Sequence, residues 1–248
     1  MLSLAKLSSL VRKQAMIRVY SDKGACDLSS DALAFELGKR FPCVQKVDSR
    51  FLKSVSWETT TSALIMGGGT CSIWEQDLGQ KGMEKIRDFV LKGGKFVGFC
   101  AGAYFAAPHS LFSFISSPPL EKNRPLKFFE GKAIGPLIPT DNPLGKEAAM
   151  AIPIKIGNTK GYCYYQSGCY FETVDETEIL AYYDKPFDKP AMIKKKSALL
   201  CGFHPEFSWE NLGSYSDPIF GSLVDALTHQ EAFRLLIWQK VVDHLSQL

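Results

Sequence analysis

The chain has 248 residues, 46% of them hydrophobic and 22% charged, with a formal net charge of +3 at pH 7. This ordinary globular composition suits one large α/β domain or two small ones. The small charge excludes a strongly basic nucleic-acid binder, and no apolar run is long enough to span a membrane. The basic run 194–196 is typical of a solvated turn, so we expect neither nucleic-acid nor membrane partners.

The first fifteen residues differ in composition from the rest. They carry three basic side chains and no acidic one, and their leucines form only a weak amphipathic face. We interpret residues 1–15 as a flexible N-terminal extension, or as the result of an upstream start codon with Met16 as the natural start. A docking helix and a targeting peptide are the alternative interpretations. Residues 16–248 are then expected to form a single domain.

The first half of the chain alternates short apolar strands with helices. Helices are expected at 31–40, where Ser29 or Ser30 serves as the N-cap, and at 83–91, where apolar residues share one face. Because strands and helices alternate, we expect a mostly parallel sheet with both faces covered. The strands are expected at 17–20, 44–47, 63–66 and 95–99.

From about Pro108 onwards, the pattern predicts a β-rich insertion punctuated by proline and glycine. A further buried strand is expected at 198–203, leading into His204. A final helix is expected at 230–245, with its apolar residues on one side. The short antiparallel strands of the insertion are expected at 152–156, 162–165, 169–172 and 179–183.

The cysteine pattern bears on compartment and cofactors. The number of cysteines is odd and their spacing is not that of a disulfide framework, which favours a reducing, cytoplasmic location. No CxxC pair occurs and the histidines are scattered, so we expect no metal and no other cofactor, with only Cys163 and Cys169 left open as a pair. The seven cysteines are Cys26, Cys43, Cys71, Cys100, Cys163, Cys169 and Cys201.

The most informative segment is Gly98–Gly102, in which an apolar strand meets one cysteine followed by small residues. This pattern is typical of a buried strand that turns sharply into a helix with a thiol at the corner. The unpaired N–H groups of a helix N-terminus favour the thiolate, which is the nucleophilic form of cysteine. Cys100 is therefore the candidate nucleophile.

A histidine and a glutamate are expected to meet Cys100 at the carboxyl edge of the sheet. His204 follows a buried strand and can take the thiol proton and later return it to a leaving group. Glu206 lies two residues further on in an extended segment, so it points the same way and can orient the imidazole.

The glycine run 67–69 follows the buried strand 63–66 and is expected at the same edge. The N–H groups of Gly68, Gly69 and Ala101 are candidates for an oxyanion hole. Each of these features alone is more typical of ordinary structure, namely a core thiol, a structural histidine and a tight turn. Only their combination indicates a site.

Together these motifs resemble those of the class I glutamine amidotransferase-like superfamily, and in particular the N-terminal domain of biotin–protein ligases and its stand-alone relatives. The likeness spans residues 17–208 and is most specific around the cysteine. It is carried by segments 63–69, 81–107, 128–137, 164–171 and 202–206.

The resemblance implies a flavodoxin-like three-layer α/β sandwich and a triad of Cys100, His204 and Glu206. Glutamine-hydrolysing members have glutamine four residues after the cysteine, where this chain has Tyr104, so an amide or ester other than glutamine is the expected substrate. Tyr104, Tyr164 and Gln166 are expected to shape its pocket. The adenylate-binding GRGRxGR loop of the ligases does not occur, so the chain is not expected to biotinylate proteins by itself.

Three functions are compatible with these features. The first is a cysteine-dependent hydrolase or amidotransferase-like enzyme with a thioacyl intermediate on Cys100. The second is a non-catalytic regulatory or binding module that works with a separate biotin–protein ligase. The third is a redox-responsive protein in which Cys100 is reversibly oxidised. We favour the first, because all three catalytic residue types are present.

Overall fold

The computed structural model describes residues 16–54, 56–174, 176–213 and 218–246, so the expectations for residues 1–15 lie outside the described residues. Within these ranges the main sheet has nine strands, in the order β2-β1-β3-β4-β13-β12-β11-β8-β9. The first five are parallel: β2 (Val44–Val47), β1 (Ile17–Tyr20), β3 (Ala63–Met66), β4 (Lys95–Phe99) and β13 (Ala198–Cys201). The other four are antiparallel: β12 (Lys189–Lys195), β11 (Glu178–Tyr183), β8 (Ala149–Ile156) and β9 (Thr159–Gln166).

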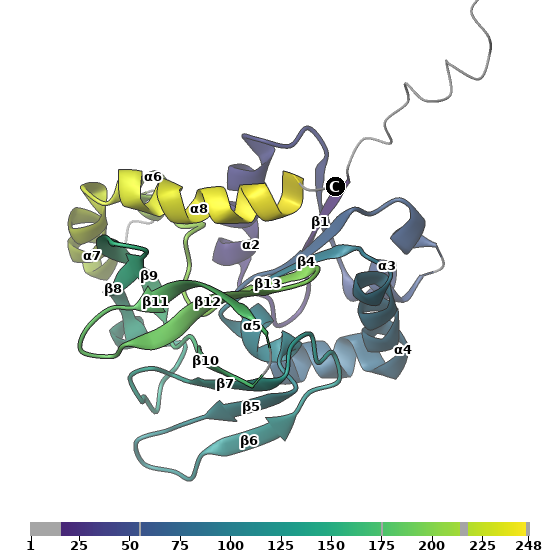
Figure 1. Cartoon of the computed structure of the whole chain (residues 1–248), viewed down its shortest axis with the longest axis horizontal. Coiled ribbons are helices and arrows are strands. Elements are labelled where there is room, and N and C mark those ends of the chain that lie inside the picture. The colour runs from purple at the N-terminus through teal and green to yellow at the C-terminus, as the bar shows by residue number, and fades with distance from the viewer. Residues whose placement is uncertain (1–15, 55, 175, 214–217, 247–248) are drawn as a thin grey trace, which may run out of the picture.

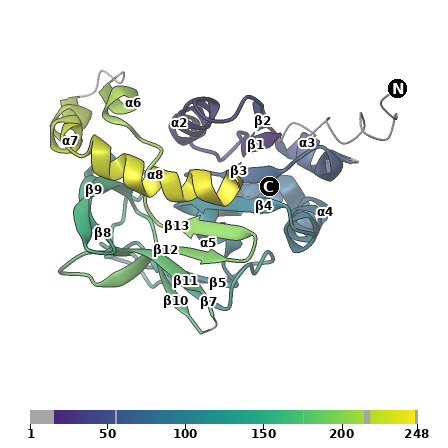
Figure 2. The same cartoon turned by 45° about the horizontal axis from the view of Figure 1, so that its top comes forward.

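Helices cover both faces of the main sheet, as Figure 1 and Figure 2 show. Helices α2 (Asp27–Gly38) and α8 (Glu231–Ser246) pack on one face, and α4 (Cys71–Leu91) and α5 (Ala101–Ala106) on the other. Along β3, Leu64 and Met66 enter the core beside α4, whereas Ile65 enters the core beside α2. Burial on both faces explains the uninterrupted apolar strands. The predicted flavodoxin-like three-layer α/β sandwich is therefore confirmed.

The β-rich second half contributes to two sheets. Its antiparallel strands extend the main sheet beyond β13, and the rest forms a separate four-stranded sheet in the order β10-β7-β5-β6. This small sheet packs on the α5 side of the molecule, where Ala133 and Phe171 share a core with Phe105. Its strands are β5 (His109–Phe112), β6 (Leu120–Asn123), β7 (Gly131–Gly135) and β10 (Tyr170–Thr173).

Several elements differ from the sequence prediction. Helix α2 begins at Asp27 with Cys26 as its N-cap, so Ser29 and Ser30 lie inside the helix and the predicted cap is wrong. Helix α4 begins at Cys71, twelve residues before the predicted start of the helix at 83–91. It bends at Gly79 (φ 58°), so the apolar residues before the bend do not continue the helical spacing of those at 83–91. The basic run 194–196 ends β12 and begins the turn into β13. The sequence predicts no range for β5, β6, β7 or β12, and α3 (Ser49–Lys53), α6 (Trp209–Gly213) and α7 (Pro218–Thr228) are also unpredicted.

The turn from β4 into α5 is packed too tightly for side chains at its glycines. A Cβ on Gly102 would collide with the carbonyl oxygen of Met66, and one on Gly98 would collide with the carbonyl of Gly102. The Gly102 N–H also donates to the carbonyl of Gly67 at 3.0 Å. The two glycines thus let α5 lie directly against β3, which brings the glycine run 67–69 beside Cys100.

The substitution Gly102→Ala is expected to lower the free energy of unfolding by about 2 kcal/mol, because the new methyl group must displace backbone rather than a flexible side chain. Urea denaturation measures this loss. Gly221→Ala is the control, since a Cβ there meets nothing within 4 Å and alanine favours a helix. Unchanged stability of Gly102→Ala would contradict the tight packing of the turn.

Candidate active site at the β4–α5 turn

Cys100 lies in the sharp turn between β4 and α5, at the carboxyl edge of the parallel strands. Its backbone has φ 48° and ψ −105°, a conformation that costs a non-glycine residue about 1–3 kcal/mol. Its N–H donates to the carbonyl of Cys201 at 2.8 Å, which ties the turn to β13. The Sγ atom lies 3.4 Å from the carbonyl oxygen of Gln166. The strand–cysteine–helix corner expected from the sequence is thus present.

His204 follows β13 and is held on two sides. Its backbone N–H donates to the backbone carbonyl of Tyr164 at 2.9 Å. Its imidazole ring packs against the rings of Tyr164 and Phe207, with centroid distances of 5.6 and 5.3 Å. Its Nδ1 lies 2.7 Å from Oε1 of Glu206, the contact that the sequence predicts. The predicted extended segment is wrong, because residues 205–206 form a turn in which the Phe207 N–H donates to the His204 carbonyl. The imidazole and the Cys100 side chain line the same cavity, and the sulfur is close enough to act on the pKa of the ring. The structure therefore places His204 between a thiol and a carboxylate.

A buried serine supports Glu206. The hydroxyl of Ser29 donates to Glu206 Oε1 at 2.8 Å and accepts the N–H of Gly68 at 3.0 Å. Glu206 is fully buried, and among the described residues its Oε2 has no hydrogen-bond partner, so Oε1 accepts from both Ser29 and His204. Sequence reasoning missed this role, because a serine near the start of a helix is equally well explained by capping.

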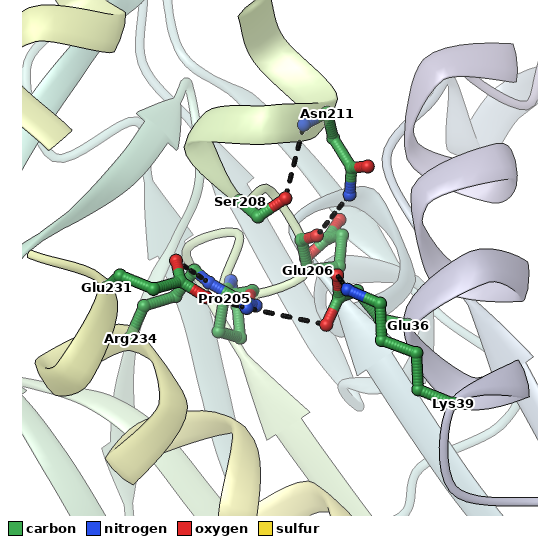
Figure 3. Close-up of polar contacts among 8 residues, drawn as sticks. All are labelled: Glu36, Lys39, Pro205, Glu206, Ser208, Asn211, Glu231 and Arg234. Carbon is green, nitrogen blue, oxygen red and sulfur yellow. Dashed lines mark hydrogen bonds and ion pairs between the residues drawn. The ribbon is translucent and has the colours of Figure 1, made fainter. Parts of the chain in front are cut away.

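A second buried network holds Pro205, the residue before Glu206 (Figure 3). Arg234 of α8 donates from Nη1 to the Pro205 carbonyl at 2.8 Å. Its Nη2 lies 2.6 Å from Oε1 of Glu231 and 3.4 Å from Oε2 of Glu36 in α2. Arg234 and Glu36 are only 4% and 2% exposed, so these charge-assisted contacts are shielded from water. Helices from two distant parts of the chain thereby fix this segment.

The protonation state of His204 follows from its neighbours. Burial disfavours the imidazolium, but the Glu206 carboxylate and a Cys100 thiolate outweigh burial and raise the pKa of His204 well above its usual 6.5. The raised pKa favours the imidazolium form of His204. An imidazolium can stabilise a neighbouring thiolate, which is the nucleophilic form in cysteine–histidine sites.

The three candidate oxyanion donors differ in availability. The Gly68 N–H is taken by Ser29, so it supports Glu206 instead of facing the cavity as a free donor. Among the described residues, the N–H groups of Gly69 and Ala101 have no hydrogen-bond partner. Gly69 has φ 152°, and a Cβ there would collide with the carbonyl of Gly24, so the turn requires glycine. Gly69 and Ala101 are therefore the better candidates.

A cavity of about 310 Å³ adjoins Cys100. Tyr104, Tyr164 and Gln166, the three residues expected to shape the pocket, all line it, and Tyr164 donates to the Gln166 side chain at 2.9 Å. Sequence reasoning missed the opposite wall, because no local pattern shows that the small sheet folds over the site. This wall consists of Ser110, Phe112, Phe114, Leu120, Lys122 and Arg124.

Tyr104, four residues after Cys100, is a fixed part of the cavity wall. Its hydroxyl donates to the carbonyl of Ser167 at 3.2 Å, and a Cβ on Gly135 would collide with that hydroxyl. Burial raises the pKa of Tyr104 well above its usual value, so the phenol stays neutral. The hydroxyl proton is already donated to the Ser167 carbonyl. Tyr104 therefore cannot replace the hydrogen bonds that a glutamine carboxamide at this position would form with a substrate.

All seven cysteines are free thiols, including Cys163 and Cys169. Within the described residues, no three His, Cys, Asp or Glu side chains cluster in a way that could hold a metal ion. No helix in the same part of the chain is long and apolar enough to cross a bilayer. The absence of cofactors and the cytoplasmic location stay predictions.

The doubly covered sheet with its cysteine turn has the same fold as several solved structures described as glutamine amidotransferases. A glutamine amidotransferase from Thermotoga maritima matches with a TM-score of 0.64 at 10% identity, covering 94% of this chain and 98% of its own. Another structure described as a glutamine amidotransferase matches with a TM-score of 0.54 at 20% identity, covering 85% of this chain and all of its own. At these identities the likeness shows the fold alone.

The family model "Biotin-protein ligase, N terminal" matches residues 15–247, so the chain belongs to this family. An uncharacterized protein from Chlamydia muridarum is 30% identical over 212 residues, which cover 77% of this chain and 80% of that protein. The biotin–protein ligase of Schizosaccharomyces pombe is 30% identical over 183 residues, 66% of this chain. The match covers only 28% of that ligase, so its ligase activity does not transfer to this chain.

Cys100→Gly is expected to be more stable than Cys100→Ala by about 1 kcal/mol. Glycine adopts a positive φ without strain, and the relief of about 1–3 kcal/mol exceeds the roughly 1 kcal/mol that glycine costs in chain entropy. Urea denaturation of the two variants, which both lack the thiol, measures the difference. A glycine variant less stable than the alanine variant would show that the strain in the turn is smaller than the roughly 1 kcal/mol that glycine costs in chain entropy.

Glu206→Gln is expected to lower the pKa of His204, because it removes the negative charge that favours the imidazolium. In the wild type, the stability that His204 contributes is fully present below pH 6.5 and is lost as the pH rises through the folded-state pKa. The variant should show a smaller loss over that range. NMR titration of the imidazole and denaturation at several pH values measure both effects.

The exposed Glu210→Gln is the control for this titration, since it removes one negative charge without touching His204. It should leave the His204 titration unchanged. If Glu206→Gln also left the titration unchanged, the carboxylate would not control the charge of His204.

Proposed function

We propose that this protein is a cysteine-dependent acyl-transfer enzyme, a hydrolase or amidotransferase-like enzyme that acts on an amide or ester other than glutamine. The observation that carries the proposal is the placement of His204 between the Cys100 side chain and the Glu206 carboxylate at the wall of a cavity. The amidotransferase-like fold and the family membership support the same class of chemistry.

In the first step, the Cys100 sulfur attacks the acyl carbon of the substrate after its proton has passed to His204. The negative charge that develops on the acyl oxygen is stabilised by the free N–H groups of Gly69 and Ala101. Glu206 keeps Nδ1 of the imidazole as the donor, so the other ring nitrogen faces the sulfur.

The remaining steps release the two products, first the amine or alcohol and then the acyl group. The tetrahedral intermediate collapses, His204 returns its proton to the departing amine or alcohol, and the acyl group stays on Cys100 as a thioester. Water or another acceptor, deprotonated by His204, then attacks the thioester and regenerates the thiol. We exclude glutamine as the substrate because Tyr104 stands at the position of the substrate-binding glutamine, and its hydroxyl already donates to the Ser167 carbonyl.

One observation favours redox chemistry as a second candidate function. Cys26 and Cys71 line the same cavity as Cys100. A sulfenic acid formed at Cys100 by a peroxide would condense with the Cys26 thiol to give a disulfide and water. Cys71 is the poorer partner, because burial raises the pKa of its thiol to about 12. A regulatory role beside a separate biotin–protein ligase rests on the family membership alone.

Activated esters are expected to acylate Cys100 of the wild type, detected as a covalent adduct by intact-protein and peptide mass spectrometry. Cys100→Ala should give no adduct at this position. His204→Asn should slow acylation about 100-fold, because the thiol loses its base.

The control is Cys26→Ala, which removes another thiol of the same cavity and should be acylated at Cys100 like the wild type. Equal labelling of the wild type and Cys100→Ala would refute acyl transfer and leave the regulatory module as the better function. Selective oxidation of Cys100 by peroxide, without acylation, would favour the redox function.

A further inference from the structure

The wall of the cavity opposite the catalytic residues is built by the hairpin of β5 and β6. Ser110 pairs with Lys122, and Phe112 pairs with Leu120. Because strand residues alternate between faces, these four side chains lie on one face of the hairpin, and all four line the cavity. Lys122 thus lines the cavity that holds Cys100, and it also borders a second cavity lined by its sequence neighbours Glu121 and Asn123.

Two cationic side chains lie on this wall, and only one is neutralised. Arg124 is 7% exposed, pairs with Glu75 and donates from Nε to Ser110 Oγ at 2.9 Å. Among the described residues, Lys122 has neither an ion pair nor a side-chain hydrogen bond. No Asp or Glu of the described chain lines the cavity. The wall therefore carries one uncompensated positive charge.

The surface between Lys122 and the nucleophile is apolar. Phe112 packs against Tyr104 on one side and Phe114 on the other, with ring centroids 5.8 and 5.1 Å away. At the cavity mouth, Leu120 and Leu144 are 47% and 72% exposed, although both are apolar. A ligand that covered this surface would remove apolar area from water.

We propose, on the basis of the proposed acyl-transfer function, that the substrate is a monoanion. Its amide or ester bond lies at Cys100, an apolar portion lies along Phe112 and Leu120, and a terminal carboxylate pairs with Lys122. A zwitterionic amino acid fits poorly, because an ammonium group would meet Lys122 and find no carboxylate in the cavity wall.

Alkylation of Cys100 by matched N-substituted iodoacetamides tests this inference independently of turnover. In this reaction the sulfur displaces iodide from the probe's methylene carbon, so it reports binding near the thiol rather than acyl transfer. The probes carry a terminal carboxylate, carboxamide or ammonium on alkyl spacers of increasing length. At low salt and at the best spacer length, the carboxylate probe is expected to react about tenfold faster than the carboxamide probe, and the ammonium probe more slowly than either.

Lys122→Gln should bring the carboxylate probe to the rate of the carboxamide probe while leaving the carboxamide rate unchanged, which also shows that the variant is folded. Lys132→Gln, at an exposed position on the other face of the small sheet, should keep the wild-type preference. The inference is overturned if no spacer length gives a carboxylate preference, or if Lys122→Gln retains that preference.

The two proposals fail separately. Acylation of Cys100 by esters without a carboxylate preference would overturn only the substrate class. A carboxylate preference in alkylation without any acyl adduct would overturn the acyl-transfer function and identify the cavity as a binding site for a carboxylate ligand.

Discussion

The close packing of α5 against β3 and β4 forces Cys100 into a positive φ, and the rest of the site depends on this turn. Gly98 and Gly102 allow the approach, because a side chain at Gly102 would meet the carbonyl oxygen of Met66. The same packing brings the glycine run after β3 beside the thiol, with the N–H groups of Gly69 and Ala101 free. A turn with relaxed backbone angles would move the thiol away from these donors.

The second constraint is the fully buried carboxylate of Glu206. A buried charge is costly unless it is paired and hydrogen-bonded. Here His204 and Ser29 both form hydrogen bonds with Oε1 of Glu206. That requirement couples α2 to the edge of the sheet that carries Cys100, while Arg234 couples α8 to it through Pro205. The helices on one face of the sheet thus determine the position and charge of an imidazole whose ring faces a thiol.

In the proposed function, the small sheet provides the selectivity of the site. The fold is shared with glutamine amidotransferases, but the cavity wall here combines the committed hydroxyl of Tyr104 with the phenyl rings of Phe112 and Phe114. Charge on this wall comes from Lys122 without an acidic counterpart. The proposed function therefore assigns the chemistry to residues of the main sheet and the selectivity to the β-rich insertion.

The sequence by itself determined the parallel strands, the thiol corner and the contact between His204 and Glu206, because each depends on an apolar run or on spacing within a few residues. The tertiary structure decided the roles of Ser29, Arg234 and the β5–β6 wall. Ser29 lies 177 positions from Glu206, and Arg234 lies 29 positions from Pro205. Contacts of this range exist only once the helices have packed on the sheet, so no local pattern encodes them.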